Sequence, residues 1–387
     1  MYLDIATGGR RAHRRAFTDD LVAQLLLAAG LTAAVATPTW ATPLQERVKS
    51  ASASSTIELP STEATDPESA ARHNWRKYMG QNGRLEEGCF HASYPNTVWE
   101  KVDCVVVQPR VHTAHVKPSG DHVETVGNGH DYVASAQGLI TEAIGEFVDS
   151  GVTSETSVGV AAFGDGGILG ANEYSVQLNT NNKGTTSACA GHSGCTVWQQ
   201  FVYATDYVWP SFNFLGISYP GVAGVFIEYW LNNWGNAACP AGWSPYVTPY
   251  ESYCVLNSAV VSAPDVPIAD LEDLELVATA SAGGYDSVIF AYDSDVYAIN
   301  TPDSVLDIAS VWTQTEFNIV GDAGGSEAVF NSGSSITPYL FLKDGSSSPP
   351  ACVDNAGTTG ETNNLNLGTC SASVFWGFPY IYFTESN

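Results

Sequence analysis

One short run of the sequence places a carboxyl group among aromatic side chains. In Val225–Leu231 (VFIEYWL), strand alternation puts Phe226, Glu228 and Trp230 on one face and the intervening residues on the other. A carboxyl group flanked by Phe and Trp is partly desolvated, which suits a general acid or a general base. We therefore predict that Glu228 is a catalytic residue.

A second run supplies a side-chain amide. In Trp198–Val202 (WQQFV), Gln200 shares a face with both ends of the run, whereas Gln199 points the other way. An amide can donate a hydrogen bond to the oxyanion that forms when water attacks a carbonyl group. The sequence thus predicts Gln200 as the catalytic partner of Glu228, with Gln199 as a substitute.

The same runs also support a different function. Aromatic rings pack on the C–H faces of sugars, and amides hydrogen-bond to sugar hydroxyl groups. A substrate-binding face is therefore predicted from Trp198, Trp230, Gln177 and Asn179, with Tyr229, Trp234, Asn232 and Asn233 nearby. A third interpretation involves no ligand, because aromatic residues in strands are more often core and a Gln and a Glu can hydrogen-bond across a ladder.

Strand-like runs must position these residues. From about Ser154 onward, at least eight runs rich in β-branched and aromatic residues alternate with turns rich in Gly, Asn, Asp and Ser. This spacing predicts an all-β domain over 154–387, an antiparallel β-sandwich or jelly roll of concanavalin-like type. The run Ser304–Trp312 is expected to form one or two helical turns.

The chain before residue 154 is expected to be organised differently. Residues 42–84 are rich in Ser, Thr, Glu and Pro and predict a disordered leader. Residues 85–153 are interpreted as a mixed N-terminal extension or as a propeptide. Apolar residues near helical spacing predict a short helix over Tyr132–Phe147 within this part.

The first 41 residues have the order of a secretion signal. An apolar run from Leu21 to Val35 and then small residues follow a basic patch of Arg10, Arg11, Arg14 and Arg15. The apolar run is shorter than the ~20 residues that span a bilayer, and no later run is long enough. We therefore predict a signal peptide over 1–41 and a secreted, extracellular protein without a membrane span.

All eight cysteines lie beyond this signal, in close successive pairs. An even number of cysteines in an exported chain indicates disulfide bonds, although the sequence alone does not select the pairing. We predict the four sequential bridges, Cys89 with Cys104, Cys189 with Cys195, Cys239 with Cys254 and Cys352 with Cys370. Zinc binding is the alternative, but the CxxC spacing typical of zinc sites is missing.

The charge of the chain limits its partners. The sequence has 41 acidic and 15 basic residues, a formal charge of −26, so we exclude nucleic acid and expect a polypeptide or an extracellular glycan as the partner. Tolerance of acid is expected, because protonation relieves self-repulsion. We predict no cofactor and no metal, since His112 and His115 have no third ligand nearby and the acidic loop residues lack EF-hand spacing. Those acidic residues are Asp286, Asp293, Asp295 and Asp303.

Two resemblances extend this interpretation. The chain resembles a family of secreted, β-rich bacterial and fungal proteins in a series of blocks that occur in the same order. The blocks are Val176–Thr180, Trp198–Tyr203, Phe226–Leu231 with Cys239–Trp243, Asp303–Asp307 with Glu316–Asp322, and Gly360–Leu367 with Phe383–Ser386. This resemblance implies an exported β-rich protein and specifies no activity.

The Gln and Glu on neighbouring strands of a sandwich also resemble the dyad of the eqolisin-type glutamic peptidases. That resemblance implies that Glu228 activates water and that Gln200 stabilises the oxyanion. The sequence therefore leads to two functions. One is a secreted, acid-tolerant endopeptidase, a hydrolase of glutamic type. The other is a secreted, non-catalytic β-sandwich that binds glycans or a cell surface.

Overall fold

The computed structural model describes most of the chain from Pro67 onward. The described ranges are 67–82, 86–107, 132–160, 167–215, 217–247, 252–354, 362–375 and 377–387. The predicted signal peptide over 1–41, the predicted leader before Pro67, and both His112 and His115 lie outside these ranges.

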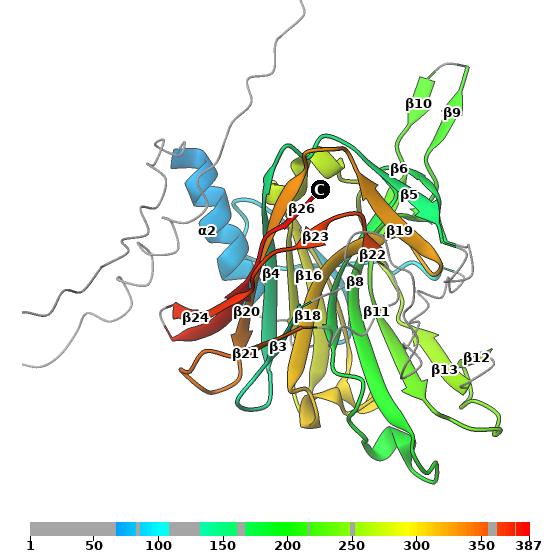
Figure 1. The fold of residues 1–387 in the computed structure, drawn as a ribbon. Helices are drawn as coiled ribbons and strands as arrows, with labels where there is room; N and C mark the ends of the chain where they lie inside the picture. Colours follow the sequence, from blue (N-terminus) through cyan, green and yellow to red (C-terminus); the bar gives the residue numbers. More distant parts are fainter. Residues whose placement is uncertain are drawn as a thin grey trace, which may run out of the picture. The chain divides into compact units, whose positions relative to one another are not determined.

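Two large antiparallel sheets form the body of the protein (Figure 1). Sheet I has the strand order β2 (Glu100–Val102), β1 (Gly88–Ser93), β17 (Asp295–Pro302), β16 (Tyr285–Tyr292), β15 (Glu275–Thr279), β4 (Glu142–Ser150), β20 (Ser335–Lys343), β25 (Phe378–Tyr382), β24 (Ser371–Phe375), and β26 (Glu385–Ser386) joins β20 to β23 (Asn366–Leu367). Sheet II has the order β12 (Ser244–Val247), β13 (Ser252–Asn257), β11 (Val222–Asn232), β8 (Thr196–Trp209), β7 (Tyr174–Thr180), β18 (Gln314–Gly321), β3 (Tyr132–Ser135), β21 (Ala351–Asp354), and β14 (Val261–Pro264) also pairs with β11.

Smaller elements complete the fold. A four-stranded sheet has the order β22 (Thr362–Asn363), β19 (Ser326–Phe330), β5 (Glu155–Gly159), β6 (Gly170–Ala171), and a hairpin consists of β9 (Phe212–Phe214) and β10 (Ile217–Tyr219). The helical elements are α2 (Pro67–Gln81), η3 (Ser187–Cys189), η4 (Ile268–Asp273), η5 (Asp303–Val305) and η6 (Ile308–Ser310). The last two confirm the helical turns predicted over Ser304–Trp312. No helix within the described ranges has the length and apolar character needed to cross a membrane.

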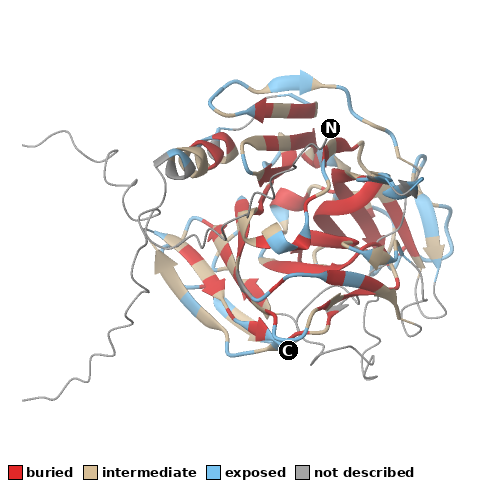
Figure 2. Cartoon of the chain, turned by 90° about the horizontal axis from the view of Figure 1, so that it is seen from above, coloured by how far each residue is buried: buried red, intermediate tan, exposed pale blue. Residues whose placement is uncertain are grey.

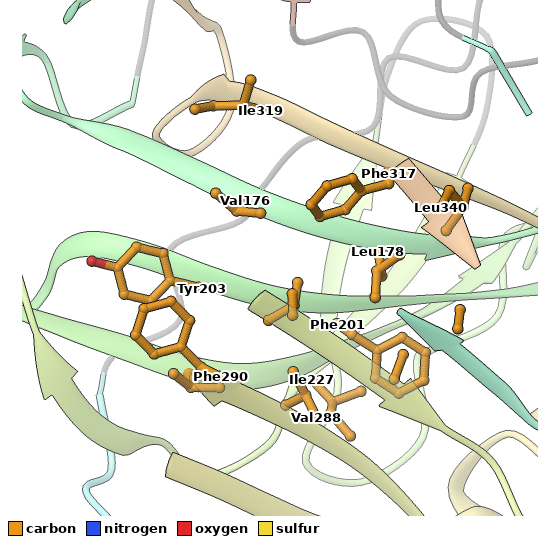
Figure 3. Close-up of a cluster of buried hydrophobic side chains, with 14 of the residues drawn as sticks. Val176, Leu178, Phe201, Tyr203, Ile227, Val288, Phe290, Phe317, Ile319 and Leu340 are labelled. Atoms are coloured by element: carbon orange, nitrogen blue, oxygen red, sulfur yellow. The ribbon is translucent and has the colours of Figure 1, made fainter. Parts of the chain in front are cut away.

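Sheets I and II pack face to face, and apolar side chains between them form the core (Figure 3). Sheet II contributes Leu178 and Phe201, and sheet I contributes Val288 and Phe290. Tyr203 of sheet II stacks on Phe290 with ring centroids 4.0 Å apart. Figure 2 shows the buried residues concentrated along these strands. The predicted all-β sandwich is confirmed, whereas the jelly-roll topology stays a prediction.

The predicted domain boundary at residue 154 is wrong. Strands β1, β2 and β4 lie within sheet I and β3 lies within sheet II, so the sandwich already includes the chain from Gly88 onward. The helix predicted over Tyr132–Phe147 is replaced by β3 and most of β4. Because β4 lies between β15 and β20, with apolar neighbours on both faces, its residues do not alternate simply and resemble helical spacing.

Part of the predicted disordered leader forms helix α2. From Asn74 onward, this helix buries Trp75 and Met79, which are four residues apart and share one helix face. Lys77 forms ion pairs with two glutamates of sheet I, Glu146 and Glu275. The last turns of α2 are therefore attached to the sandwich by both apolar and ionic contacts.

The four predicted disulfides are confirmed. They join Cys89 to Cys104, Cys189 to Cys195, Cys239 to Cys254 and Cys352 to Cys370, with sequence separations of 6 to 18. Loops of this length lose roughly 2 to 3 kcal/mol of closure entropy each in the unfolded chain. Three of the bridges fix local loops, whereas Cys352–Cys370 links β21 of sheet II to the segment between β23 and β24 of sheet I.

Gly145 allows the two sheets to approach each other at β4. A methyl group at this position would lie 2.3 Å from the ring of Phe317 on sheet II. We expect Gly145→Ala to lower the free energy of unfolding by about 1 to 3 kcal/mol through overpacking, measured by chemical denaturation. Gly80→Ala is the matched control, because a methyl group there meets Val277 at an ordinary 3.7 Å and improves helix propensity. Equal stability of the two variants would contradict the close contact.

Candidate functional site

Four polar side chains lie side by side on the face of sheet II that points away from the core. The strand register pairs Glu228 on β11 with Gln200 on β8, Gln200 with Asn179 on β7, and Asn179 with Glu316 on β18. We call these four residues the polar row. Each of them is at most 1% exposed, so the row is enclosed in the protein.

Strand alternation explains why the polar row shares one face. The neighbours Phe201 and Ile227 belong to the core between the sheets, so Gln200 and Glu228 must point the opposite way. The faces predicted for Gln200 and Glu228 are therefore confirmed. The predicted site residues Gln177 and Asn179 are also brought to this face, because β7 pairs directly with β8.

Gln199 lies on the opposite face of β8 and cannot act as a substitute for Gln200. Its Nε2 donates a hydrogen bond to Asp286 Oδ2 at 3.0 Å, on the core side of the sheet. Burial and the nearby Asp303 raise the pKa of Asp286 well above its ordinary value. The sheet backbone therefore separates this amide and carboxyl pair from the polar row.

Trp230 orients both predicted catalytic residues. Its Nε1 donates to Gln200 Oε1 at 2.9 Å and to Glu228 Oε1 at 3.0 Å. Because an indole nitrogen only donates, the atom of Gln200 that faces Trp230 must be the amide oxygen. Gln200 Nε2 then points the other way and donates to Gln177 Oε1 at 2.9 Å, and Gln177 Nε2 donates to Ser175 Oγ at 3.0 Å. This chain of donors and acceptors fixes the direction of the Gln200 amide.

The aromatic rings predicted to bind sugars are not at the surface. Trp198 and Trp230 have no exposed area, and they pack with Tyr253 and Val255 in a separate apolar cluster. Their ring centroids are 5.6 Å apart, and Tyr253 meets Trp230 edge to face. A sugar platform needs an exposed ring face, so this arrangement does not support sugar binding at these two residues.

Glu316 is a member of the site that the sequence did not predict. Together with Asn179 and Thr315 it lines a small pocket at the β18 end of the polar row, with a volume of about 10 Å³. That volume is close to the minimum of ~10 to 15 Å³ that one water molecule needs. Asn179 Oδ1 and Thr315 Oγ1 have no partner within the protein, so polar atoms are available to bind such a water.

The sequence did contain a signal for Glu316. In Thr315–Val320, polar Glu316 and Asn318 alternate with apolar Phe317 and Ile319. Glu228 likewise lies between two apolar residues that point to the opposite face of its strand. The missing information was the pairing of β18 with β7, which are separated by more than 130 residues of chain. Alternation identifies the face of a strand but does not identify its neighbour in the sheet.

A second group of carboxyl groups lies elsewhere in the protein, and four of its five members are buried. We call Glu155, Glu173, Asp206, Asp265 and Asp322 the acid cluster. The Asp206 amide N donates to Asp265 Oδ1 at 3.0 Å, and the Ser211 amide N donates to Asp206 Oδ2 at 2.7 Å. Both carboxyl oxygens of Glu155 are buried, and the backbone groups of Asn172 and Glu173 are their hydrogen-bonding neighbours.

Burial and mutual repulsion favour the protonated forms in the acid cluster. Burial, with the charge of Asp322, raises the pKa of Glu155 to about 9. Burial, with a hydrogen bond and repulsion from Asp206, raises the pKa of Glu173 to about 9. The pKa of Asp265 is raised for the same reasons. The folded protein therefore stabilises the neutral carboxyl groups, which form readily in acid.

In the part of the chain that the structure describes, no three His, Cys, Asp or Glu side chains are grouped so that they could hold a metal ion.

Comparisons with protein families, with curated proteins and with solved structures find no match. The geometry of the polar row and of the acid cluster is therefore the basis for interpreting function.

Proposed function

We propose that the protein is a secreted endopeptidase of glutamic type that works in acid. The observation that carries this proposal is the direct cross-strand pairing of Glu228 with Gln200, with one oxygen of each side chain held by Trp230 Nε1. Four disulfides support an oxidising location outside the cytoplasm. The raised pKa values of Glu155 and Glu173 support an acidic working environment.

In the proposed reaction, the Glu228 carboxylate removes a proton from a water molecule while the water oxygen attacks the scissile carbonyl carbon. The oxyanion that forms accepts a hydrogen bond from Gln200 Nε2, which has a second hydrogen besides the one donated to Gln177. As the C–N bond breaks, the leaving amine takes up a proton from Glu316 at the other end of the polar row, relayed through water. The proton held by Glu228 returns through water to Glu316, so both groups are regenerated and all protons are balanced.

Access to the polar row requires a movement. Side chains that are at most 1% exposed cannot contact a polypeptide, so the face of sheet II that bears the row must open before substrate binds. The pocket lined by Asn179 and Glu316 reaches one end of the row. We infer that opening begins at this end, and that the enclosed form is an inactive one.

Two adjacent glutamines provide the test. Wild-type protein, incubated with a denatured protein substrate at pH 3 to 5, is expected to cleave it. Gln200→Ala removes the oxyanion donor and should lower kcat by about 10² to 10³-fold. Gln199→Ala is the matched control, since it removes a buried amide from the same strand on the opposite face and should leave kcat unchanged. Equal activity of the two variants, or no cleavage by the wild type, would remove the proposal.

A specific observation supports the second candidate, a non-catalytic glycan-binding protein. Four aromatic rings lie together on the face of sheet I that points away from the core. Register pairs Tyr339 with Tyr382 and Phe341 with Tyr380, and their ring centroids are 5.4 and 5.2 Å apart. These rings are partly exposed, unlike Trp198. Aromatic rings with phenolic hydroxyls suit the C–H faces and hydroxyl groups of neutral sugars.

Glycan-array binding separates this candidate from the peptidase. A binding protein should bind a neutral polysaccharide without altering it, and Tyr380→Ala should lower that binding by about tenfold through loss of one stacking ring. Gln200→Ala should not change it. Binding that is insensitive to Tyr380→Ala would exclude this surface.

A further inference from the structure

The hairpin of β9 and β10 exposes an unusual amount of apolar surface. Of the twelve large apolar side chains that are exposed in the described part of the chain, six lie in or beside this hairpin. They are Trp209 (60% exposed), Phe212 (46%), Phe214 (58%), Leu215 (87%), Ile217 (58%) and Tyr219 (40%). Contiguous apolar patches of roughly several hundred Å² on a folded protein mark interaction surfaces.

The strand register gathers these side chains on one face. Phe212 is paired with Tyr219, and Phe214 is paired with Ile217, so the four side chains project from the same side of the two-stranded sheet. The rings of Phe212 and Tyr219 stack with centroids 4.8 Å apart. Strands β9 and β10 project from the body of the protein (Figure 1), so this face does not pack on either large sheet.

The hairpin has no charged residue in a strongly acidic chain, and this distribution of charge argues against anionic and cationic partners. No charged residue occurs between Asp206 and Glu228, whereas the whole chain carries a formal charge of −26. An anionic surface would be repelled by the chain, and a cationic partner would find no carboxylate within the hairpin. The hairpin therefore fits a neutral, apolar partner.

The small size of the hairpin and the order of its apolar side chains indicate that its partner is lipid and not a second copy of the chain. A hairpin of two three-residue strands buries much less than the ~1,200 Å² that a stable protein interface needs. The most exposed residue, Leu215, is at the tip, with Phe214 and Ile217 next to it. Trp209 and Tyr219 lie at the base. Aliphatic residues at the deepest point with Trp and Tyr above them match the order found across a membrane interface.

We propose that the β9–β10 hairpin inserts its tip into the interface of an electrically neutral lipid bilayer and holds the protein at that surface. The interaction is peripheral, because the hairpin is far shorter than the strands needed to cross a bilayer. It does not depend on the peptidase proposal, since it uses no residue of the polar row.

Vesicle sedimentation tests the proposal with the full chain. The protein should sediment with sucrose-loaded vesicles of phosphatidylcholine, and replacing part of the phosphatidylcholine with phosphatidylserine should weaken binding. Phe214→Ser combined with Leu215→Asn should reduce the partition coefficient by about a hundredfold, because two inserted apolar side chains are lost. Leu139→Ser combined with Val247→Ser is the matched control, since both residues are exposed elsewhere, and it should bind like the wild type.

Three results would overturn the proposal. They are no sedimentation with phosphatidylcholine vesicles, equal loss of binding in the hairpin and control variants, or binding that requires phosphatidylserine. Analytical ultracentrifugation without lipid tests whether a second copy of the chain, and not lipid, binds the apolar face of the hairpin. If the wild type forms dimers that the hairpin variant does not form, the apolar face is an interface between copies of this chain, and the lipid proposal is wrong. Unchanged far-ultraviolet circular dichroism of both variants shows that they fold.

Discussion

The protein is expected to become less stable as the pH rises from about 4.5 to about 9. Glu155 and Glu173 have pKa values raised to about 9 in the folded protein, mainly by burial, whereas an unfolded glutamate titrates near 4.5. Each group therefore binds a proton more tightly when the protein is folded. The resulting stabilisation is complete below pH 4.5 and is lost progressively as the pH approaches the folded pKa.

The size of this effect follows from the pKa values. One unit of pKa difference corresponds to about 1.4 kcal/mol, so a raise of even one unit at Glu155 gives about 1.4 kcal/mol, and solvent screening makes the contribution of Glu173 smaller. Buried Asp286 and Glu385 act in the same direction, because burial raises the pKa of both groups, that of Glu385 to about 7. A change of several kcal/mol is a large fraction of the stability of a typical domain.

Thermal unfolding between pH 4 and pH 9 measures the effect, and two variants isolate its origin. Glu155→Gln keeps a neutral side chain at every pH, so this variant should resemble the wild type at pH 4 and be more stable than it at pH 8. Asp344→Asn should behave in the opposite way. Burial opposes ionisation of Asp344, but hydrogen bonds from the Ser346 and Gln137 backbone amides outweigh it and lower its pKa.

For Asp344 the stabilisation is present above the unfolded pKa and is lost as the pH falls, so Asp344→Asn should lose stability at neutral pH and very little in strong acid. The two variants therefore separate the acid cluster from a general effect of charge. A wild-type unfolding temperature that rises steadily from pH 4 to pH 8 would contradict the protonated acid cluster. It would also remove one support for an acidic working environment.

The sequence predicted the local parts of this fold better than the long-range ones. Alternation in the strands around Gln200 and Glu228 gave the correct faces, and the close cysteine pairs gave the correct disulfides, because both depend on neighbours along the chain. Strand β4 was predicted as part of a helix, since a central strand with apolar neighbours on both faces loses its period of two.

For the candidate site, too, the sequence predicted the pair on adjacent strands and missed the residues that only long-range folding brings together. Gln200 and Glu228 could be combined because β8 and β11 are adjacent in the sheet and follow each other through the β9–β10 hairpin. Glu316 could not be added, because only the folded sheet places β18 next to β7. The acid cluster was also missed, since Glu155 and Asp322 come from distant elements and no local pattern distinguishes them from solvated acids.

Glu316→Gln is expected to reduce peptidase activity as strongly as Glu228→Gln. Peptide hydrolysis needs one group that accepts a proton from water and one that donates a proton to the leaving amine, and two carboxyl groups in different surroundings can divide these roles. The polar row places one glutamate on each side of Gln200 and Asn179, with three strand spacings or about 14 Å between their α-carbons. Once the face opens, a peptide group bound at Gln200 and Glu228 lies too far from Glu316 for direct contact, so Glu316 reaches the leaving amine through water.

Each single replacement should lower kcat/KM by about 10² to 10⁴-fold at pH 4, and the double replacement should fall no further, because the two groups act in one step. Glu385→Gln is the matched control, since it replaces another buried glutamate, which hydrogen-bonds to Asn363 outside the row. Full activity of Glu316→Gln would leave Glu228 as both acid and base. Full activity of Glu228→Gln would eliminate the glutamic mechanism, even if Glu316→Gln were inactive, because the group paired with Gln200 would then not be the one that activates water.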